Sequence, residues 1–186
     1  ELQRFRRWGD TWVIGGGLGS MIPLGRTEEN PYALTEQGLT HQHIQMGGGT
    51  FDPIASITAI ASGHQWGFVS QASGKMSMYE NALGFKPSSE IRLSAGPTYR
   101  FSSKVMATSD VKFQRDWQAT WDGEPDPLTG RTALELGGSV IYRFNPTLAV
   151  MGQGRTTLAQ WSMDASLIQK FIGTLGLSYT PSGKAD

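Results

Sequence analysis

The feature that most constrains the fold is a strand pattern that recurs along the chain and ends each time in aromatic residues beside a turn. The pattern occurs in 91–101 and in 134–144, which both end in Tyr-Arg-Phe, and more weakly in 171–179. Apolar and polar residues alternate with a period of two, so one side of each strand is apolar and the other carries Arg, Thr, Ser or Glu. Strands of about ten residues with aromatic ends and intervening turns are typical of outer-membrane β-barrels. We therefore predict that the chain crosses a membrane with strands.

Composition excludes several other classes of protein. The 16 basic and 16 acidic residues balance, whereas a nucleic-acid partner usually requires a basic excess. The longest apolar stretch, 54–61, is interrupted by Ser56 and Thr58 and is far shorter than the ~18 residues of a membrane helix. The chain has no cysteine, which excludes disulfides, thiolate metal sites and thiol catalysis. Its 24 glycines include several inside strand-like runs, where barrel curvature favours them.

Turn signals divide the 186 residues into about eight strands. The predicted strands are 10–22, 43–61, 64–74, 90–101, 104–121, 131–144, 147–161 and 167–179. Long polar connections alternate with short turns between them, as in bacterial barrels. The predicted fold class is all-β, an antiparallel up-and-down transmembrane β-barrel formed by a single domain over 1–186. Because the chain begins at Glu1 rather than Met, we expect either a mature barrel or a piece, truncated at either end, of a larger one. Residues 1–8 read like the middle of a strand, as a truncated barrel would have.

Strand parity divides the side chains between lumen and membrane. The predicted lumen-lining residues are charged: Arg92, Arg100, Asp110, Lys112, Asp116, Glu135, Arg143, Arg155 and Lys170. The predicted aromatic girdle consists of Tyr99, Phe101, Tyr142, Phe144 and Tyr179 at one rim, with Trp117, Trp121 and Trp161 at the other. A soluble β-calyx would reverse this arrangement and place Leu93, Leu136 and Leu175 inside. Aromatic residues at strand ends and a thin apolar face favour the membrane barrel.

Two segments carry a resemblance to a known family. They are Pro23-Leu-Gly-Arg-Thr-Glu-Glu-Asn-Pro-Tyr-Ala-Leu and His41-Gln-His-Ile-Gln-Met-Gly-Gly-Gly-Thr-Phe-Asp-Pro53. This stretch resembles poorly characterised bacterial outer-membrane transporter-like proteins, the family named for the MetA pathway of phenol degradation. The likeness is sharpest over 20–60 and diffuse afterwards. It implies an outer-membrane β-barrel that passes small aromatic or other hydrophobic compounds. Such proteins have more strands than we count, and many end in an aromatic strand residue, which this chain does not.

Candidate chemical sites are weak. His41 and His43 lie two residues apart, so strand parity places both imidazoles on one side, near the outer mouth. Two imidazoles can bind Zn²⁺ or Cu²⁺, but a metal site generally needs three or four ligands, and we interpret the pair as hydrogen-bonded lumen residues. The sequence contains no G-x-S-x-G, H-E-x-x-H or P-loop pattern. We predict no enzyme activity, no catalytic residues, no metal and no cofactor.

The function predicted from these features is that of a porin-like channel or passive transporter for small molecules in the bacterial outer membrane. Two alternatives stay open: a structural barrel that anchors or sheathes a partner complex, and a soluble calyx that binds a hydrophobic ligand. The lumen charges would give selectivity in a wide pore, or a salt-bridge network that fills a narrow one. The predicted partners are the lipid bilayer and either a protein complex or further copies of the chain, with no nucleic acid.

Overall fold

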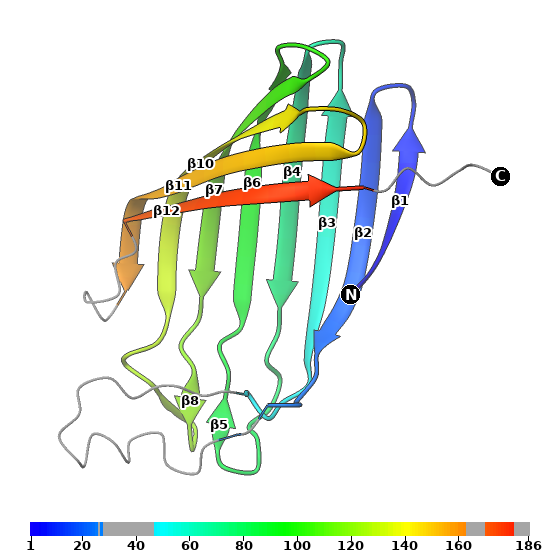
Figure 1. The fold of residues 1–186 in the computed structure, drawn as a ribbon. Helices are drawn as coiled ribbons and strands as arrows, with labels where there is room; N and C mark the ends of the chain where they lie inside the picture. Colours follow the sequence, from blue (N-terminus) through cyan, green and yellow to red (C-terminus); the bar gives the residue numbers. More distant parts are fainter. Residues whose placement is uncertain (26, 28–46, 163–169, 181–186) are drawn as a thin grey trace.

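A computed structural model describes residues 1–25, 27, 47–162 and 170–180, which form an all-β structure (Figure 1). The long strands are β1 (Leu2–Trp8), β2 (Trp12–Met21), β3 (Asp52–Ser62), β4 (Trp66–Lys75), β6 (Glu90–Arg100), β7 (Val105–Asp116), β10 (Arg131–Arg143), β11 (Leu148–Ser162) and β12 (Phe171–Tyr179). Short strands are β5 (Phe85–Lys86), β8 (Thr120–Trp121) and β9 (Glu124–Pro125).

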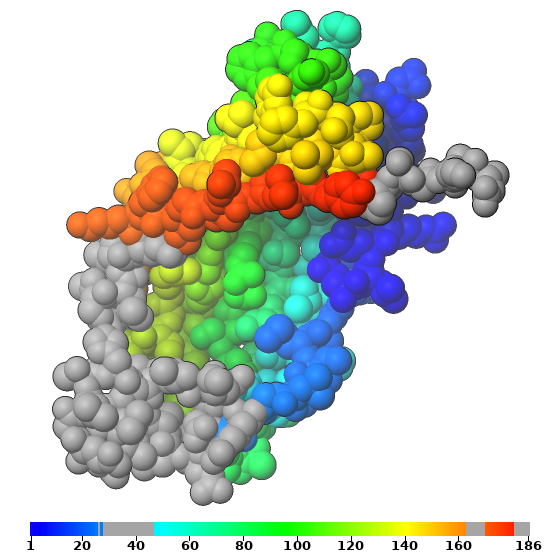
Figure 2. All heavy atoms as spheres, viewed as in Figure 1, coloured from blue at the N-terminus to red at the C-terminus, as the bar shows by residue number. Residues whose placement is uncertain are grey.

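The long strands form one sheet, the main sheet, in which each strand pairs with its neighbours in chain order. Within the described residues the order is β1-β2-β3-β4-β6-β7-β10-β11-β12, and every neighbouring pair is antiparallel. The sheet twists and curls, so that β12 runs across the view while β2 to β4 run along it (Figure 1). The space-filling view shows the molecule hollowed beneath β12 (Figure 2). The predicted all-β, antiparallel up-and-down meander is confirmed.

The structure does not show a closed barrel. The edges of the main sheet are β1 and β12, and they do not pair with each other. The sheet is therefore open, and the prediction of a barrel closed within this chain is not confirmed. The physical reason is that alternation specifies how each strand pairs with the next and carries no information about whether the first and last strands meet. Residues 2–8, which read like the middle of a strand, do form one.

Side-chain hydrogen bonds fix the short turns at one end of the sheet. Between β10 and β11, Asn145 Oδ1 accepts hydrogen bonds from the backbone N–H groups of Thr147 and Leu148 at 2.9 Å each. Between β6 and β7, Ser102 Oγ accepts from the N–H groups of Lys104 and Val105 at 3.2 and 3.1 Å. Asn and Ser occupy such positions because their side chains replace the missing strand partner.

At the opposite end, two predicted strand boundaries were wrong. The predicted strand 104–121 ends as β7 at Asp116, and Trp121 belongs to β8 instead. There, β5, β8 and β9 form a small sheet beside the main one. Beyond the end of β7, the N–H of Ala119 donates to Thr129 Oγ1 at 2.9 Å and not to a strand of the main sheet. Of the predicted strand 43–61, the residues 47–51 precede β3, and 43–46 lie outside the described residues.

The two faces of the main sheet differ in character. The side chains that share parity with Asp110, Lys112 and Glu135 form the inner face, and the alternate side chains form the outer face. On the outer face, Val111, Val140 and Leu177 are 46%, 51% and 73% exposed. Among the described residues, the buried hydrophobic side chains are only Ala119 and Ala133, while several polar ones are buried. The part of the chain that the structure describes thus has no apolar core.

Candidate functional site

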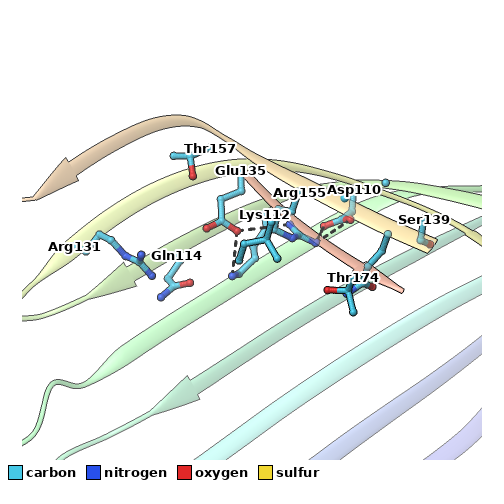
Figure 3. A pocket seen from close by; sticks show the side chains of 13 residues that line it. Asp110, Lys112, Gln114, Arg131, Glu135, Ser139, Arg155, Thr157 and Thr174 are labelled. Carbon is cyan, nitrogen blue, oxygen red and sulfur yellow. Dashed lines mark hydrogen bonds and ion pairs between the residues drawn. The ribbon is translucent and has the colours of Figure 1, made fainter. Parts of the chain in front are cut away.

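A cavity of about 340 Å³ lies against the inner face where the sheet curls. Strands β7, β10, β11 and β12 supply its walls, and the labelled side chains converge on it (Figure 3). Most of the lining is polar: Asp110, Lys112, Gln114, Arg131, Glu135, Ser139, Gln153, Arg155, Thr157 and Thr174.

The centre of the site is an ion network of four side chains, Asp110, Lys112, Glu135 and Arg155. Arg155 Nη2 donates to Asp110 Oδ2 at 2.8 Å and to Oδ1 at 3.1 Å. Lys112 Nζ donates to Glu135 Oε2 at 3.2 Å. Arg155 Nη1 lies 3.8 Å from the same Glu135 oxygen and thereby links the two pairs. The network contains two cations and two anions, so its formal charge is zero.

The register of three strands explains how the network forms. Gly137 of β10 lies directly between Asp110 of β7 and Arg155 of β11. A Cβ atom at Gly137 would stand 2.6 Å from Asp110 Oδ1 and 2.7 Å from Arg155 Nη2. The glycine therefore leaves the space through which Arg155 reaches across β10, whereas Lys112 and Glu135 are direct cross-strand partners.

A second charged layer lies closer to the long connections. Arg131 Nε is 3.6 Å from Asp116 Oδ2, directly across the β7–β10 pair. Gln114 is buried, and its Nε2 donates to Asp116 Oδ2 at 2.8 Å. On β6, Arg92 Nη2 donates to Glu90 Oε2 at 2.6 Å. These layers also pair each carboxylate with a donor.

The inner face is not polar throughout. Toward the short turns, Val13, Ile60 and Val69 are in register on β2, β3 and β4. Met106 and Ile141 pair across β7 and β10 at the same end. All five are partly buried. Near the turns the inner face thus contains apolar side chains beside Arg100 and Arg143, and the charge-based analysis of the sequence did not find this apolar group.

The predicted lumen residues lie as follows. Arg92, Arg100, Asp110, Lys112, Asp116, Glu135, Arg143 and Arg155 all fall on the inner face by register. The structure brings Asp110, Lys112, Glu135 and Arg155 together. Arg100 and Arg143 stand apart from the network at the turn end, beside a separate cavity. Lys170 precedes β12 and is exposed, and its carbonyl accepts a hydrogen bond from Thr156 Oγ1 at 2.9 Å.

Four of the predicted girdle residues at the turn rim pack edge to face in two pairs. The ring centroids of Tyr99 and Phe101 lie 4.7 Å apart, and those of Tyr142 and Phe144 lie 4.9 Å apart. Trp66 joins them, 4.6 Å from Tyr99. Tyr179 ends β12 and is exposed.

At the other rim, Trp117 and Trp161 are also exposed. Trp121 does not stand on the wall of the main sheet. It packs against Phe85 of the small sheet with ring centroids 4.6 Å apart.

His41 and His43 lie outside the described residues. Within those that are described, no three His, Asp or Glu side chains gather closely enough to hold a metal ion. In the same residues, no helix is long and apolar enough to cross a bilayer.

A buried carboxylate was not foreseen from the sequence. Asp52, at the start of β3, is 3% exposed. Its Oδ1 accepts hydrogen bonds from Thr50 Oγ1 and Ser77 Oγ, each at 2.9 Å, and the N–H of Ser77 donates to Ser89 Oγ. These bonds tie the ends of β3, β4 and β6 together. Three hydroxyl residues within 40 positions of one Asp give no local signal that could have revealed the cluster.

Neither a protein-family profile nor a curated protein sequence matches the chain. The resemblance of 20–60 to the outer-membrane transporter family stays a prediction. The network has two cations and two anions, so it offers no excess charge that would attract ions of one sign.

Proposed function

We propose that the main sheet is part of the wall of an outer-membrane β-barrel that passes small molecules, with the ion network at its narrowest level. The observation that carries this proposal is that the two faces of the main sheet are the reverse of those of a soluble protein. Large apolar side chains on the outer face are exposed, while the inner face holds paired charges around a cavity. Burying an outer face of this kind in acyl chains gains about 25 cal/mol for each Å² of apolar surface.

The aromatic pairs at the turn rim support the same proposal. Tyr and Trp side chains favour the level of the lipid headgroups, where an apolar ring and a polar tip are both satisfied. A soluble calyx would need the opposite arrangement, yet Leu93, Leu136 and Leu175 are exposed on the outer face.

The free edges add a requirement. A bilayer offers no hydrogen-bond partners to the unpaired backbone groups of β1 and β12, so both edges need strand partners there. The proposed channel therefore includes further strands between β12 and β1. The balanced network predicts weak selectivity for the sign of an ion and favours uncharged solutes, including the small hydrophobic compounds suggested by the resemblance.

Two measurements on protein purified from its native membrane test the proposal. Flotation with lipid vesicles should carry the protein to the top of a density gradient, because the outer face needs an apolar solvent. Planar-bilayer recording should then show discrete conductance steps. Arg155→Ala should raise the step size by opening the network, whereas Arg143→Ala, an inner-face Arg outside it, should change the step less. Protein that remains soluble without detergent would disprove the membrane location.

The second candidate is an anchoring barrel that passes no solute, which the charge pairing of the network favours. Salt bridges that fill a narrow lumen block it. A protein that floats with vesicles, gives no conductance as wild type or as Arg155→Ala, and co-purifies with a fixed partner would support this candidate over the channel.

A further inference from the structure

A second cavity, of about 670 Å³, lies on the main sheet at the end of the long connections. Ala55, Gly74 and Ile91 form its floor and are in direct register on β3, β4 and β6, with their side-chain positions on the outer face. Two of these three positions carry almost no side chain, which hollows the surface there. Met76 and Trp117, both exposed, also line this groove.

The charges of the outer face have one sign only. On the described strands of the main sheet, the charged outer-face residues are Arg4, Arg6 and Arg115. Carboxylates on those strands lie on the inner face, where two hydroxyls donate to Asp52 and each of the others lies beside a cation. The outer face therefore complements an anion.

Arg115 places one of these charges beside the groove. It is the direct cross-strand neighbour of Ile91, and its guanidinium carbon lies 5.5 Å from the ring centroid of Trp117. Within the described residues Arg115 forms no ion pair, since Glu90 is bound to Arg92 and Asp116 to Arg131. Lys86, also without an ion pair there, lines the same groove.

We propose that this groove binds an anionic phospholipid of the bilayer, with an acyl chain over Gly74 and the phosphate at Arg115. A largely apolar groove, with Arg115 next to its floor residue Ile91 and without an ion pair among the described residues, matches an amphiphile with an anionic head. Trp117 marks the depth of the headgroups. The inference rests on the proposed function, because only an outer face embedded in a membrane is offered lipid.

The test measures which lipid the protein retains. The purified full chain is reconstituted in vesicles of phosphatidylcholine and phosphatidylglycerol, extracted gently, and examined by native mass spectrometry. Wild type should retain phosphatidylglycerol preferentially. Arg115→Gln should lower that preference about tenfold, as expected for loss of one charge-assisted hydrogen bond. Arg143→Gln, an inner-face Arg outside the groove, is the matched control and should leave the preference unchanged.

A second variant tests the groove itself. A Cβ at Gly74 would meet its nearest atoms at 3.6 and 3.9 Å, which is ordinary contact, so Gly74→Leu should fold. It should lower retention of phosphatidylglycerol by filling the floor. Inorganic phosphate added as a competitor should not displace the lipid, because it lacks an acyl chain.

The outcomes separate the two proposals. Protein that does not float with vesicles disproves the membrane location and the lipid site together. Protein that floats, but retains both lipids equally or is unaffected by Arg115→Gln, overturns the lipid site alone. Displacement of the lipid by inorganic phosphate, or full retention of phosphatidylglycerol by Gly74→Leu, would show that the groove does not hold the acyl chain. Either result would also overturn the lipid site.

Discussion

At the scale of single residues, a glycine decides whether distant charges meet. Alternation in the sequence was enough to place Asp110, Lys112 and Glu135 on one face, because parity within a strand is a local property. It could not show that Arg155 reaches Asp110, since that contact depends on the register of three strands and on the missing side chain of Gly137.

Gly137→Ala should therefore destabilise the protein by about 1–3 kcal/mol, the usual cost of overpacking a filled site. Gly138→Ala is the matched control, because its Cβ would lie on the opposite face at an ordinary 3.6 Å from the nearest atom. Urea unfolding in detergent measures both. The loss of stability caused by Gly137→Ala should be smaller in an Arg155→Gln background. The side chain that the new methyl group displaces is then shorter and uncharged. Equal effects of the two glycine substitutions would contradict the proposed contact.

At the scale of elements, long periodic strands were predictable and short ones were not. The sequence ranges 90–101 and 131–144 agree closely with β6 and β10, since each combines clear alternation with an aromatic end and a turn. The small sheet has strands of only two residues, which carry no periodicity. The end of β7 was missed because Trp117 and Trp121 continue its parity after the backbone has left the ladder.

Substitutions in β1 test whether the outer face contacts lipid. Arg4 and Arg6 fall on the outer face of this strand, and Arg7 falls on the inner face. An Arg in contact with lipid costs up to about 2–4 kcal/mol near the middle of a bilayer. Arg4→Leu and Arg6→Leu should therefore raise the stability of the protein in vesicles, and Arg7→Leu should not. Refolding titrations in vesicles provide the measurement, and destabilisation by Arg4→Leu would indicate a polar partner over β1.

At the scale of the whole molecule, the decisive feature is the direction of the two edge strands. The main sheet, as described, joins its strands by eight antiparallel pairings, so β1 and β12 point the same way. An antiparallel seam between them needs an odd number of additional strands. No local pattern encodes this count, which is why closure could not be predicted from alternation.

Amide hydrogen exchange on the 186-residue chain in detergent tests the open seam. Backbone N–H groups of β1 and β12 that point away from β2 and β11 should exchange rapidly, because no other described strand pairs with them there. Those of β6, which is paired on both sides, should be strongly protected. Uniform protection of both edge strands in a monomeric sample would mean that the seam closes within the chain.

The pairing of every long strand with its neighbour in sequence also bears on how the structure arises. Contacts between successive strands close only modest loops, so hairpins can be added one after another without a search for remote partners. On this view β7 and β10, which carry three of the four network side chains, would assemble before Arg155 arrives on β11. Synthesis or insertion halted after β10 would leave Asp110 without its guanidinium, and such an intermediate should be held together by backbone bonds before its interior charges are matched.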